Sequence, residues 1–378
     1  MKLLIIGGTG VLSTAVVSEA LNRGVEVTMI NRGHRMDRIP QGIRFVKADS
    51  RDAETIDKAL SGCSFDAVID FVCYDKQQVE NSLNLFSKYV GQYIFISSAA
   101  VLDTRVQGVL NEDSPKVLPT WDYSVQKWKA ELFVQEECAG RGIHYTIVRP
   151  GITYDDTRIP YGFSPRYGYH WTLVARAKAG KPVVKWNNGI NRCNMMRVED
   201  FAVGVVSLVA NEKAMDEAFI VCGDDAPSFM DVILSLEKSL GITIPTIDVD
   251  VAFLESVIPG RKGEMEGRSR DAVLSNAKVK EVAPDFKQNI SLDDGVRMTV
   301  DAYRNSNFQK GIDWVYDAQC DFLIKKWCRK KKIARKQFHL GFVDYLGNAS
   351  LKDRFLYCSI YYQDLALVRL AKKARKRI

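Results

Sequence analysis

The sequence predicts an α/β fold with a doubly wound parallel sheet, a smaller C-terminal lobe and a basic helical C-terminal extension. Three observations carry this prediction. Short apolar runs alternate with amphipathic stretches over residues 1–150, as in successive βαβ units. A glycine-rich turn directly follows the first apolar run. The excess of positive charge lies entirely within residues 311–378.

The expected strands of residues 1–150 are apolar at nearly every position, which is typical of a sheet covered by helices on both faces. They are Lys2–Ile6, Val25–Ile30, Arg44–Val46, Ala67–Phe71, Tyr93–Ser97 and Tyr145–Val148. From the spacing of their apolar residues, the intervening helices are Val11–Arg23, Ala53–Leu60, Gln77–Tyr89 and Tyr123–Arg141. We therefore expect a Rossmann-type dinucleotide-binding domain over residues 1–150.

Residues 151–310 are expected to form a substrate-binding lobe that is partly interleaved with the sheet. The expected elements are helices at Trp171–Ala179, Asp200–Ala210 and Ser228–Leu240, with short strands near Pro182–Trp186 and Ala218–Cys222. These strands either extend the sheet or belong to the lobe. Ligands of doubly wound proteins bind outside the carboxyl ends of the strands, so a lobe that follows the sixth strand would cover that crevice.

Residues 311–378 form the basic extension, with 16 Lys+Arg against 6 Asp+Glu, a net of +10. The remaining residues hold 37 against 40, a net of −3, so the +7 of the whole chain comes from its C-terminal end. Helices are expected at Ile312–Lys332 and Leu351–Ala371. The second has an imperfect apolar face made of Phe355, Leu356, Ile360, Leu365, Val368 and Leu370.

Three explanations of this basic extension stay open. It could pack on the rest of the chain or on a second subunit, contact an anionic membrane peripherally, or bind nucleic acid. Eight basic residues occur among the twelve from Lys325 to Lys336. No nucleic-acid motif is present, so a nucleic-acid partner is the least favoured of the three.

Composition excludes several classes of protein. The chain has 378 residues, 46% of them apolar, yet no apolar run approaches the roughly 20 residues of a transmembrane helix. The N-terminal run from Leu3 to Ile6 is too short for a signal peptide. The eight cysteines are scattered without a Cys-x-x-Cys pair, so neither a disulfide framework nor a metal site is expected. These features favour a cytoplasmic protein.

The glycine-rich turn runs from Gly7 to Ser13 and opens a helix. Glycine suits this position because the turn is tight and the backbone must approach a pyrophosphate at the positive end of the helix. Gly7 and Gly10 take the first two positions of a Gly-x-x-Gly-x-x-Gly spacing, and the small Ser13 takes the third. The residues expected to bind the dinucleotide here are Gly7, Thr9, Gly10, Val11 and Leu12.

The second strand is followed by Asn31, Arg32 and Gly33, with Arg35 close by. A protein that prefers NAD usually has an acidic residue here to bind the ribose hydroxyls, and this chain has none. Two arginines could instead bind a 2′-phosphate through charge-assisted hydrogen bonds. Asn31, Arg32 and Arg35 are thus expected cofactor residues, and NADP is favoured over NAD.

A tyrosine and a lysine four residues apart, Tyr123 and Lys127, would emerge on one face of a helix. Ser97 and Ser98 end the fifth strand, at the edge of the sheet where active sites of this architecture form. A phenol with a pKa of about 10 is a poor base at neutral pH. A nearby ammonium favours the phenolate, and a serine hydroxyl can hydrogen-bond the reacting oxygen.

With these motifs the sequence resembles the extended short-chain dehydrogenase/reductase superfamily, of the NAD(P)-dependent epimerase/dehydratase type. The resemblance covers Met1 to about Lys310. It rests on Gly7-Gly8-Thr9-Gly10, Asp49-Ser50, Ser97-Ser98-Ala99-Ala100-Val101, Tyr123-Ser124-Val125-Gln126-Lys127, Arg149-Pro150-Gly151-Ile152-Thr153-Tyr154 and Val198-Glu199-Asp200.

The resemblance implies roles for individual residues. Ser98 would be the catalytic serine and Tyr123 the acid/base, while Lys127 would tune Tyr123 and hold the nicotinamide ribose. Asp49 and Ser50 are expected beside the adenine, and Pro150 beside the nicotinamide. Ile152, Thr153 and Arg192 are expected beside the substrate. In this family a hydride passes between the nicotinamide and a sugar carbon. A sugar or nucleotide-sugar substrate and a homodimer are therefore expected.

Three departures from the family pattern narrow the function. Dehydratases of this type carry Asp-Glu after the catalytic serine or threonine, whereas this chain has Ala99-Ala100, which disfavours dehydration. The arginine for the substrate diphosphate would fall on Cys193, with Arg192 beside it and Arg197 later.

The third departure is Asp155-Asp156 in place of Gly-Pro. These acids could bind sugar hydroxyls or be exposed loop charges, and the second interpretation is favoured. We expect a sugar epimerase or ketoreductase. The alternatives are a nucleotide-sugar dehydratase and a non-catalytic dinucleotide-binding protein that acts through its basic extension.

Overall fold

A computed structural model describes residues 1–117, 119–306, 311–341 and 349–365. The chain forms two compact units that are interleaved along the sequence. The first comprises Met1–Tyr154, Arg192–Pro227 and Arg270–Ser291. The second comprises Asp155–Asn191, Ser228–Ser269 and the chain from Leu292 onward.

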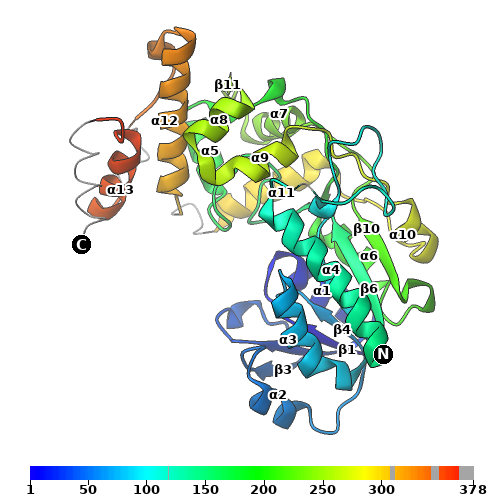
Figure 1. The fold of residues 1–378 in the computed structure, drawn as a ribbon. Helices are drawn as coiled ribbons and strands as arrows, with labels where there is room; N and C mark the ends of the chain where they lie inside the picture. Colours follow the sequence, from blue (N-terminus) through cyan, green and yellow to red (C-terminus); the bar gives the residue numbers. More distant parts are fainter. Residues whose placement is uncertain (118, 307–310, 342–348, 366–378) are drawn as a thin grey trace, which may run out of the picture. The chain divides into compact units, whose positions relative to one another are not determined.

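The first unit is built on a seven-stranded parallel sheet in the order β10-β6-β5-β4-β1-β2-β3 (Figure 1). Its strands are β1 (Lys2–Ile6), β2 (Glu26–Asn31), β3 (Arg44–Lys47), β4 (Phe65–Asp70), β5 (Val90–Ile96), β6 (His144–Pro150) and β10 (Glu217–Val221). All six strands predicted for residues 1–150 are present. The strand predicted near Ala218–Cys222 extends the sheet as β10, which pairs in parallel with β6.

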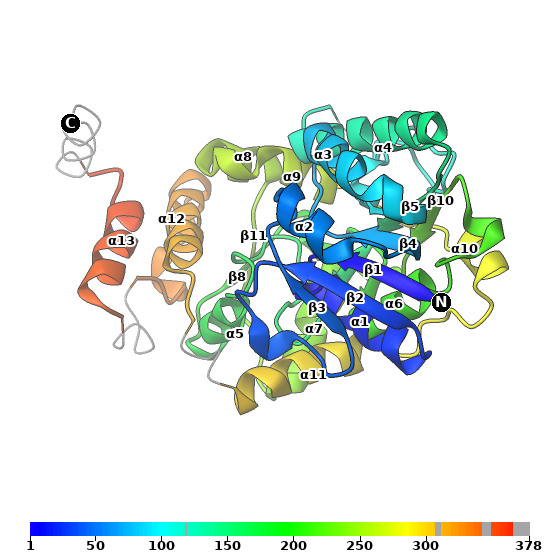
Figure 2. The same cartoon turned by 90° about the horizontal axis from the view of Figure 1, so that it is seen from below.

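Helices cover both faces of this sheet, α3 and α4 on one and α1 and α6 on the other (Figure 2). The helices of the first unit are α1 (Val11–Asn22), α2 (Ala53–Leu60), α3 (Lys76–Phe86), α4 (Asp122–Arg141), α6 (Val198–Val206) and α10 (Ala277–Val282). In β1, Leu3 and Ile5 belong to one core, and Leu4 and Ile6 belong to the other. This burial on both faces explains why the strands are apolar at nearly every position.

Local capping fixes several helix ends of the first unit. The side chains of Asp52 and Asp75 accept hydrogen bonds from backbone amides in the first turns of α2 and α3. Helix α4 ends at Gly142, which has φ of +68° in the left-handed conformation that glycine adopts without a steric penalty. The predicted boundaries of these helices were accordingly close.

Two short strands of the first unit had not been predicted. They are β7 (Ile152–Tyr154) and β9 (Met195–Arg197), and they pair in parallel. Three residues are too few to show the alternation by which a strand is recognised. Their pairing brings two segments of the resemblance, one around Thr153 and one before Val198, to the same place.

The second unit contains a two-stranded parallel sheet of β8 (Val183–Lys185) and β11 (Thr246–Asp248). Its helices are α5 (Trp171–Lys178), α7 (Phe229–Leu240), α8 (Val251–Val257), α9 (Lys262–Arg268), α11 (Leu292–Asn305), α12 (Trp314–Lys331) and α13 (Leu351–Tyr361). Helix α11 was missed, because Gly295 and two acidic residues interrupt its start. Its buried residues Val296, Val300 and Tyr303 nevertheless recur at helical spacing.

The two helices of the basic extension, α12 and α13, lie side by side within the second unit (Figures 1 and 2). Helix α13 ends at Tyr361, ten residues short of its predicted end, and the last predicted positions lie outside the described residues. The predicted apolar face of this helix was wrong in part. Phe355 and Leu365 are exposed, whereas Tyr357 and Tyr361 are buried against α12. Val368 and Leu370 lie outside the described residues.

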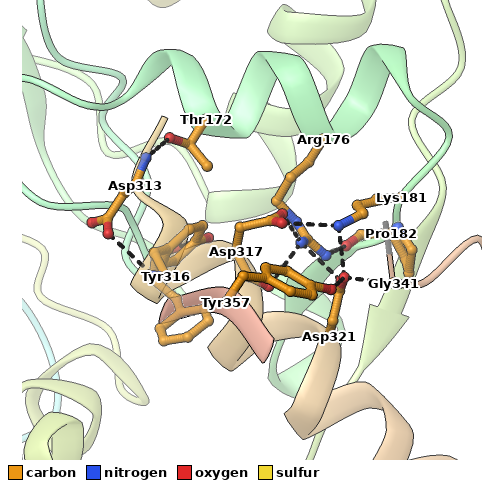
Figure 3. Close-up of polar contacts among 11 residues, drawn as sticks. Thr172, Arg176, Lys181, Pro182, Asp313, Tyr316, Asp317, Asp321, Gly341 and Tyr357 are labelled. Atoms are coloured by element: carbon orange, nitrogen blue, oxygen red, sulfur yellow. Dashed lines mark hydrogen bonds and ion pairs between the residues drawn. The ribbon is translucent and has the colours of Figure 1, made fainter. Parts of the chain in front are cut away.

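A buried cluster of charges joins α12 to the rest of the second unit (Figure 3). Arg176 of α5 contacts Asp317 at 2.5 Å and Asp321 at 2.9 Å, and Lys181 contacts the same two carboxylates at 2.9 and 2.6 Å. All four side chains are almost completely removed from solvent. The Tyr357 hydroxyl of α13 donates to Asp321. Helix α12 is thus packed into the unit, as the first explanation of the basic extension requires.

Candidate active site

The glycine-rich turn fits tightly against its neighbours in the first unit. Gly7 has φ of +86°, and a Cβ atom there would lie 2.4 Å from Val72 Cγ1. A Cβ atom on Gly8 would lie 2.6 Å from Met29 Cε. Contacts this short do not occur between real carbon atoms. Gly7, with its positive φ, therefore requires glycine, whereas a side chain at Gly8 would require the flexible end of Met29 to move. The backbone consequently runs close to the ends of β2 and β4.

Ser13 holds the turn closed. Its hydroxyl donates to Gly7 O at 2.9 Å and accepts from Gly10 N at 2.8 Å. The side chain is buried, in agreement with the expectation that a small residue allows close packing of helix and strand. Serine therefore adds two hydrogen bonds that a third glycine could not make.

The start of α1 fits the pyrophosphate of a dinucleotide. Gly10 caps the helix without a side chain, and the first turn contains no acidic residue. The amides of Val11 and Leu12 have no carbonyl partner within the helix, because they belong to its first turn. They offer N–H donors at the positive end of the helix dipole, whereas the Thr9 amide donates to Gly7 O at 2.9 Å within the turn.

Two arginines lie near this turn, after β2. Asn31 Oδ1 accepts from Gly33 N at 2.8 Å and shapes the loop, while Arg35 Nη1 donates to Thr9 O at 3.3 Å. Arg32 and Arg35 are exposed. Directly after β2, where the ribose is expected to bind, the loop therefore has two arginine side chains and no carboxylate.

Asp49 and Ser50 follow β3 at the same edge of the sheet. Hydrogen bonds from Arg51, both side chain and backbone, lower the pKa of Asp49 to about 2, and the charge of Arg32 contributes a smaller part. The ends of β2 and β3 are therefore close together, as expected of two strands that flank an adenosine site. Asp49 is ionised at any physiological pH.

The two serines after β5 have different environments. Ser97 is buried and donates to Glu131 Oε1 at 2.5 Å, and Glu131 forms a buried ion pair with Arg149 at 2.8 Å. Ser98 instead begins a 3₁₀ helix, where its hydroxyl accepts from Ala100 N at 3.1 Å. The Ser97 hydroxyl is therefore occupied by a buried carboxylate, whereas the Ser98 hydroxyl has a backbone amide as its partner.

Tyr123 and Lys127 lie in the first two turns of α4, with contrasting exposure. Tyr123 is 37% exposed and stacks near Trp121, with ring centroids 5.6 Å apart. Lys127 is 2% exposed, and its Nζ donates to Cys73 O at 2.7 Å and to Ile96 O at 2.9 Å. Because Ile96 is two residues before Ser98, this bond brings Lys127 to the segment that carries the serine.

Burial lowers the pKa of Lys127 to about 8, although the negative charge of Asp70 opposes the shift. The ammonium is therefore the main form at neutral pH and is lost in mildly alkaline solution. Two of its three donors are taken by backbone carbonyls, so a third remains for a ligand hydroxyl. The two carbonyls thus hold the Lys127 ammonium in a fixed position, four residues after Tyr123 on α4.

Asp70, the last residue of β4, was not singled out from the sequence. It is buried and accepts from Val72 N at 2.8 Å, from Cys73 N at 3.2 Å and from Tyr93 OH at 3.1 Å. These bonds fix the turn whose Cys73 carbonyl receives Lys127. An acid directly after the apolar run 67–69 was the available signal.

The residues expected near nicotinamide and substrate also lie in the first unit. Pro150 ends β6, and Ile152 and Thr153 belong to β7. Arg192 is exposed, with its Nε on Ala226 O at 3.0 Å. Arg197, the other candidate for the missing family arginine, is buried and paired with Glu199 at 2.6 Å. Of the two arginines, Arg192 has the head group accessible to an anion.

Asp155, in the second unit, accepts from the Thr157 amide at 2.9 Å and from its hydroxyl at 2.7 Å. This is a local turn, in line with the interpretation of Asp155-Asp156 as loop charges. Asp156 is exposed.

Comparison with known proteins gives a match to a family model. The model is described as the NAD dependent epimerase/dehydratase family and matches residues 3–222. The match includes the glycine-rich turn, Ser98, Tyr123, Lys127 and the segment around Thr153.

Curated relatives fall into different classes. The chloroplast stem-loop binding protein of 41 kDa b from Arabidopsis thaliana is 26% identical over 347 residues, covering 86% of this chain and 84% of the relative. The 2′-dehydrokanamycin reductase of Streptomyces kanamyceticus is 21% identical, and the match covers 76% of this chain and 80% of the reductase. A UDP-glucose 4-epimerase from Azospirillum brasilense is 25% identical, with 39% and 48% covered.

Solved structures share the fold. UDP-glucose 4-epimerase from Thermotoga maritima, determined with UDP-glucose, has a TM-score of 0.64 at 18% identity, covering 81% of this chain and 99% of the epimerase. The Thermus thermophilus UDP-glucose 4-epimerase, in complex with NAD, has a TM-score of 0.63 at 18% identity, covering 81% and 100%. At this level of identity, the likeness establishes the architecture.

Proposed function

Since the chain belongs to the NAD dependent epimerase/dehydratase family, we propose that it is an epimerase or ketoreductase acting on a sugar, with a nucleotide sugar as the favoured substrate. One observation carries the proposal. Lys127 is buried four residues after the exposed Tyr123 on α4 and is hydrogen-bonded to the strand end that leads to Ser98. Removing a lysine ammonium from water costs free energy, and a buried lysine with a shifted pKa is typical of a functional site.

The three side chains have distinct roles in this proposal. Tyr123 exchanges a proton with the substrate hydroxyl, and the Lys127 ammonium favours the phenolate that accepts it. Ser98 donates a hydrogen bond to the same substrate oxygen and holds it in position. When bound, the nicotinamide supplies or accepts the hydride. Gly7, Thr9, Gly10, Val11 and Leu12 would hold its pyrophosphate, and Lys127 its ribose.

The residues after Ser98 favour epimerisation or reduction over dehydration. Ala99 and Ala100 form the 3₁₀ helix at this strand end, so no carboxylate directly follows the serine to move the protons of an elimination. Relatives named as UDP-glucose 4-epimerase and as 2′-dehydrokanamycin reductase support this choice of reaction class. A dehydratase is the less favoured alternative.

One relative favours a second candidate. The Arabidopsis protein named for stem-loop binding matches most of this chain, which supports a dinucleotide-binding protein that acts on nucleic acid. The presence of Ser98, Tyr123 and Lys127 together favours catalysis, because binding alone has no need of all three. We also expect a substrate lobe over residues 151–310, a homodimer and a cytoplasmic location.

The proposal is tested by Tyr123→Phe, which removes the acid/base hydroxyl and leaves Lys127 intact. We expect turnover of UDP- and dTDP-hexoses, or reduction of their keto forms, to fall at least about a hundredfold, with dinucleotide binding retained. Tyr89→Phe is the matched control, because the Tyr89 hydroxyl donates to Asp57 at 2.8 Å outside the site.

Turnover of Tyr123→Phe close to that of the wild type would contradict the assignment. A wild-type protein that binds the dinucleotide but converts no member of the sugar-nucleotide panel would contradict the substrate class.

A further inference from the structure

Helix α13 exposes a group of large apolar side chains. Leu351 is 85% exposed, Phe355 64% and Leu365 53%, and Leu356 and Tyr362 are also exposed. Leu351, Phe355 and Tyr362 follow helical spacing along one side, whereas Tyr357 and Tyr361 pack against α12 from the other. Single exposed apolar residues are ordinary, but five within fifteen residues form a patch.

Exposed cations lie in the last turn of α12 and in the residues that follow it. They are Arg329, Lys330, Lys331, Lys332, Arg335 and Lys336. Within the described part of the chain, none of the six forms an ion pair with a carboxylate. Lys325 and Lys326, one turn earlier, both contact Asp364, at 2.9 and 3.8 Å. Where α12 meets α13, one carboxylate thus offsets part of the charge of the basic extension, and no described carboxylate pairs with the six cations that follow.

The C-terminal end of α13 lies near the cations. Lys325 Nζ donates to Tyr361 O at 2.9 Å, so the last turn of α13 lies against the part of α12 that precedes Arg329. Burial raises the pKa of Tyr361, and the positive charge of Arg335 opposes that shift. We call the exposed apolar side chains of residues 351–365 and the six cations together the tail surface.

We propose that the tail surface docks peripherally on an anionic lipid bilayer. The cations face lipid phosphates, and Leu351, Phe355 and Leu365 enter the boundary between head groups and acyl chains. Among the described helices none is long and apolar enough to cross a bilayer, so the contact is with one leaflet. This docking is independent of the reaction at Tyr123.

The combination of features selects this partner. Nucleic acid would use the cations, but the aliphatic side chains of α13 contribute nothing to the recognition of phosphates. A second copy of the chain would bring a surface of the same positive sign against this one, which is repulsive. A bilayer with anionic head groups is complementary to both the charge and the apolar side chains.

The experiment uses the full chain and sedimentation with vesicles of phosphatidylcholine, with or without about 30 mol% phosphatidylglycerol. We expect binding to the anionic vesicles only. Since each Lys or Arg near such a surface changes the partition about fivefold, the variant Arg329→Gln/Arg335→Gln/Lys336→Gln should bind about a hundredfold more weakly. The variant Leu351→Ser/Phe355→Ser should also bind more weakly, at unchanged charge.

Two control variants carry the same chemical changes elsewhere. Lys58→Gln/Lys129→Gln/Lys213→Gln removes three exposed charges from the first unit, and Leu132→Ser/Leu234→Ser removes two exposed leucines. Both should bind anionic vesicles like the wild type. Retained dinucleotide binding checks that the variants of the tail surface are folded.

Three results of the vesicle experiment would overturn the proposal. They are absence of binding to the anionic vesicles, equal loss in the control and tail-surface variants, and release of the protein from vesicles by equimolar RNA stem-loop. The last would identify nucleic acid as the partner. Size-exclusion chromatography in which Leu351→Ser/Phe355→Ser dissociates a dimer would likewise overturn it in favour of a second copy.

Discussion

At the scale of the residue, the candidate site contains two pairs of residues that are close in sequence, and in each pair one side chain is buried and the other is more accessible. Ser97 is bound to Glu131 within the fold, while Ser98 stands at the start of a 3₁₀ helix. Tyr123 is exposed, while Lys127, on the same face of α4, is buried on two carbonyls. In each pair the buried residue fixes the local backbone and the other can meet a substrate.

The buried lysine predicts a pH effect on stability. Its folded-state pKa is about 8, below the ordinary value of 10.5, so between these values the unfolded chain holds a proton that the folded chain lacks. Stability from this group therefore rises with pH across that window, and the cost of burying the ammonium is present in full below about pH 7.

From pH 7 to pH 9, the wild type should gain about 1.4 kcal/mol of unfolding free energy relative to Lys127→Met. The measurement is urea unfolding of both proteins at the two pH values, without dinucleotide. Lys129→Met, exposed on the same helix, should show no such difference. A difference between wild type and Lys127→Met that does not vary with pH would refute this account.

The arginines after β2 predict cofactor preference. In the variant Arg32→Ala/Arg35→Ala, the affinity for NADP should fall at least about tenfold, because a 2′-phosphate loses two charge-assisted partners, while NAD affinity changes little. Isothermal titration with each dinucleotide measures both. Arg38→Ala is the control. Equal loss for the two dinucleotides, or a wild type that prefers NAD, would contradict the proposed preference.

At the scale of the element, α12 is held in the second unit by charges as well as by apolar packing. Burial by itself would raise the pKa of Asp321, but Arg176 and Lys181 bring it below its ordinary value. The carboxylate also accepts from Tyr357 of α13 and, at 3.1 Å, from Gly341 N. One side chain thus connects α5, α12 and α13, which are remote in the sequence.

Asp321→Asn should destabilise the second unit by about 3–5 kcal/mol, because the substitution leaves two buried cations with a single carboxylate. Asp364→Asn, which removes the more exposed partner of Lys325 and Lys326, should cost about 1 kcal/mol or less. Denaturant unfolding at pH 7 compares the two variants. Equal costs would show that the buried cluster does not hold α12.

At the scale of the whole molecule, the net charge differs between residues 1–310 and the basic extension, and each part has its own consequence for binding partners. The net of −3 over residues 1–310 offers no general attraction for polyanions, so single arginines matter there. The net of +10 that follows is itself divided. Part of it is neutralised by acids within the second unit, and part remains at the end of α12, where the tail surface forms.

The sequence by itself determined the doubly wound sheet, the glycine-rich turn and the placement of Tyr123 and Lys127 four residues apart on one helix. These are local properties: strands such as Lys2–Ile6 are apolar at nearly every position because both faces are covered, and residues four apart on a helix share a face. Boundaries set by nearby caps, such as Asp52, were predicted closely for the same reason.

Only the tertiary structure showed that Ser97 is bound to Glu131, revealed Asp70 in the turn that Lys127 contacts, and separated the chain into two interleaved units. It also showed that α12 of the basic extension packs within the second unit. Arg176 and Asp317 are 141 residues apart, and no local pattern couples them. A charged residue looks the same in sequence whether it faces water or an opposite charge, because its cost depends on partners that only folding brings within reach.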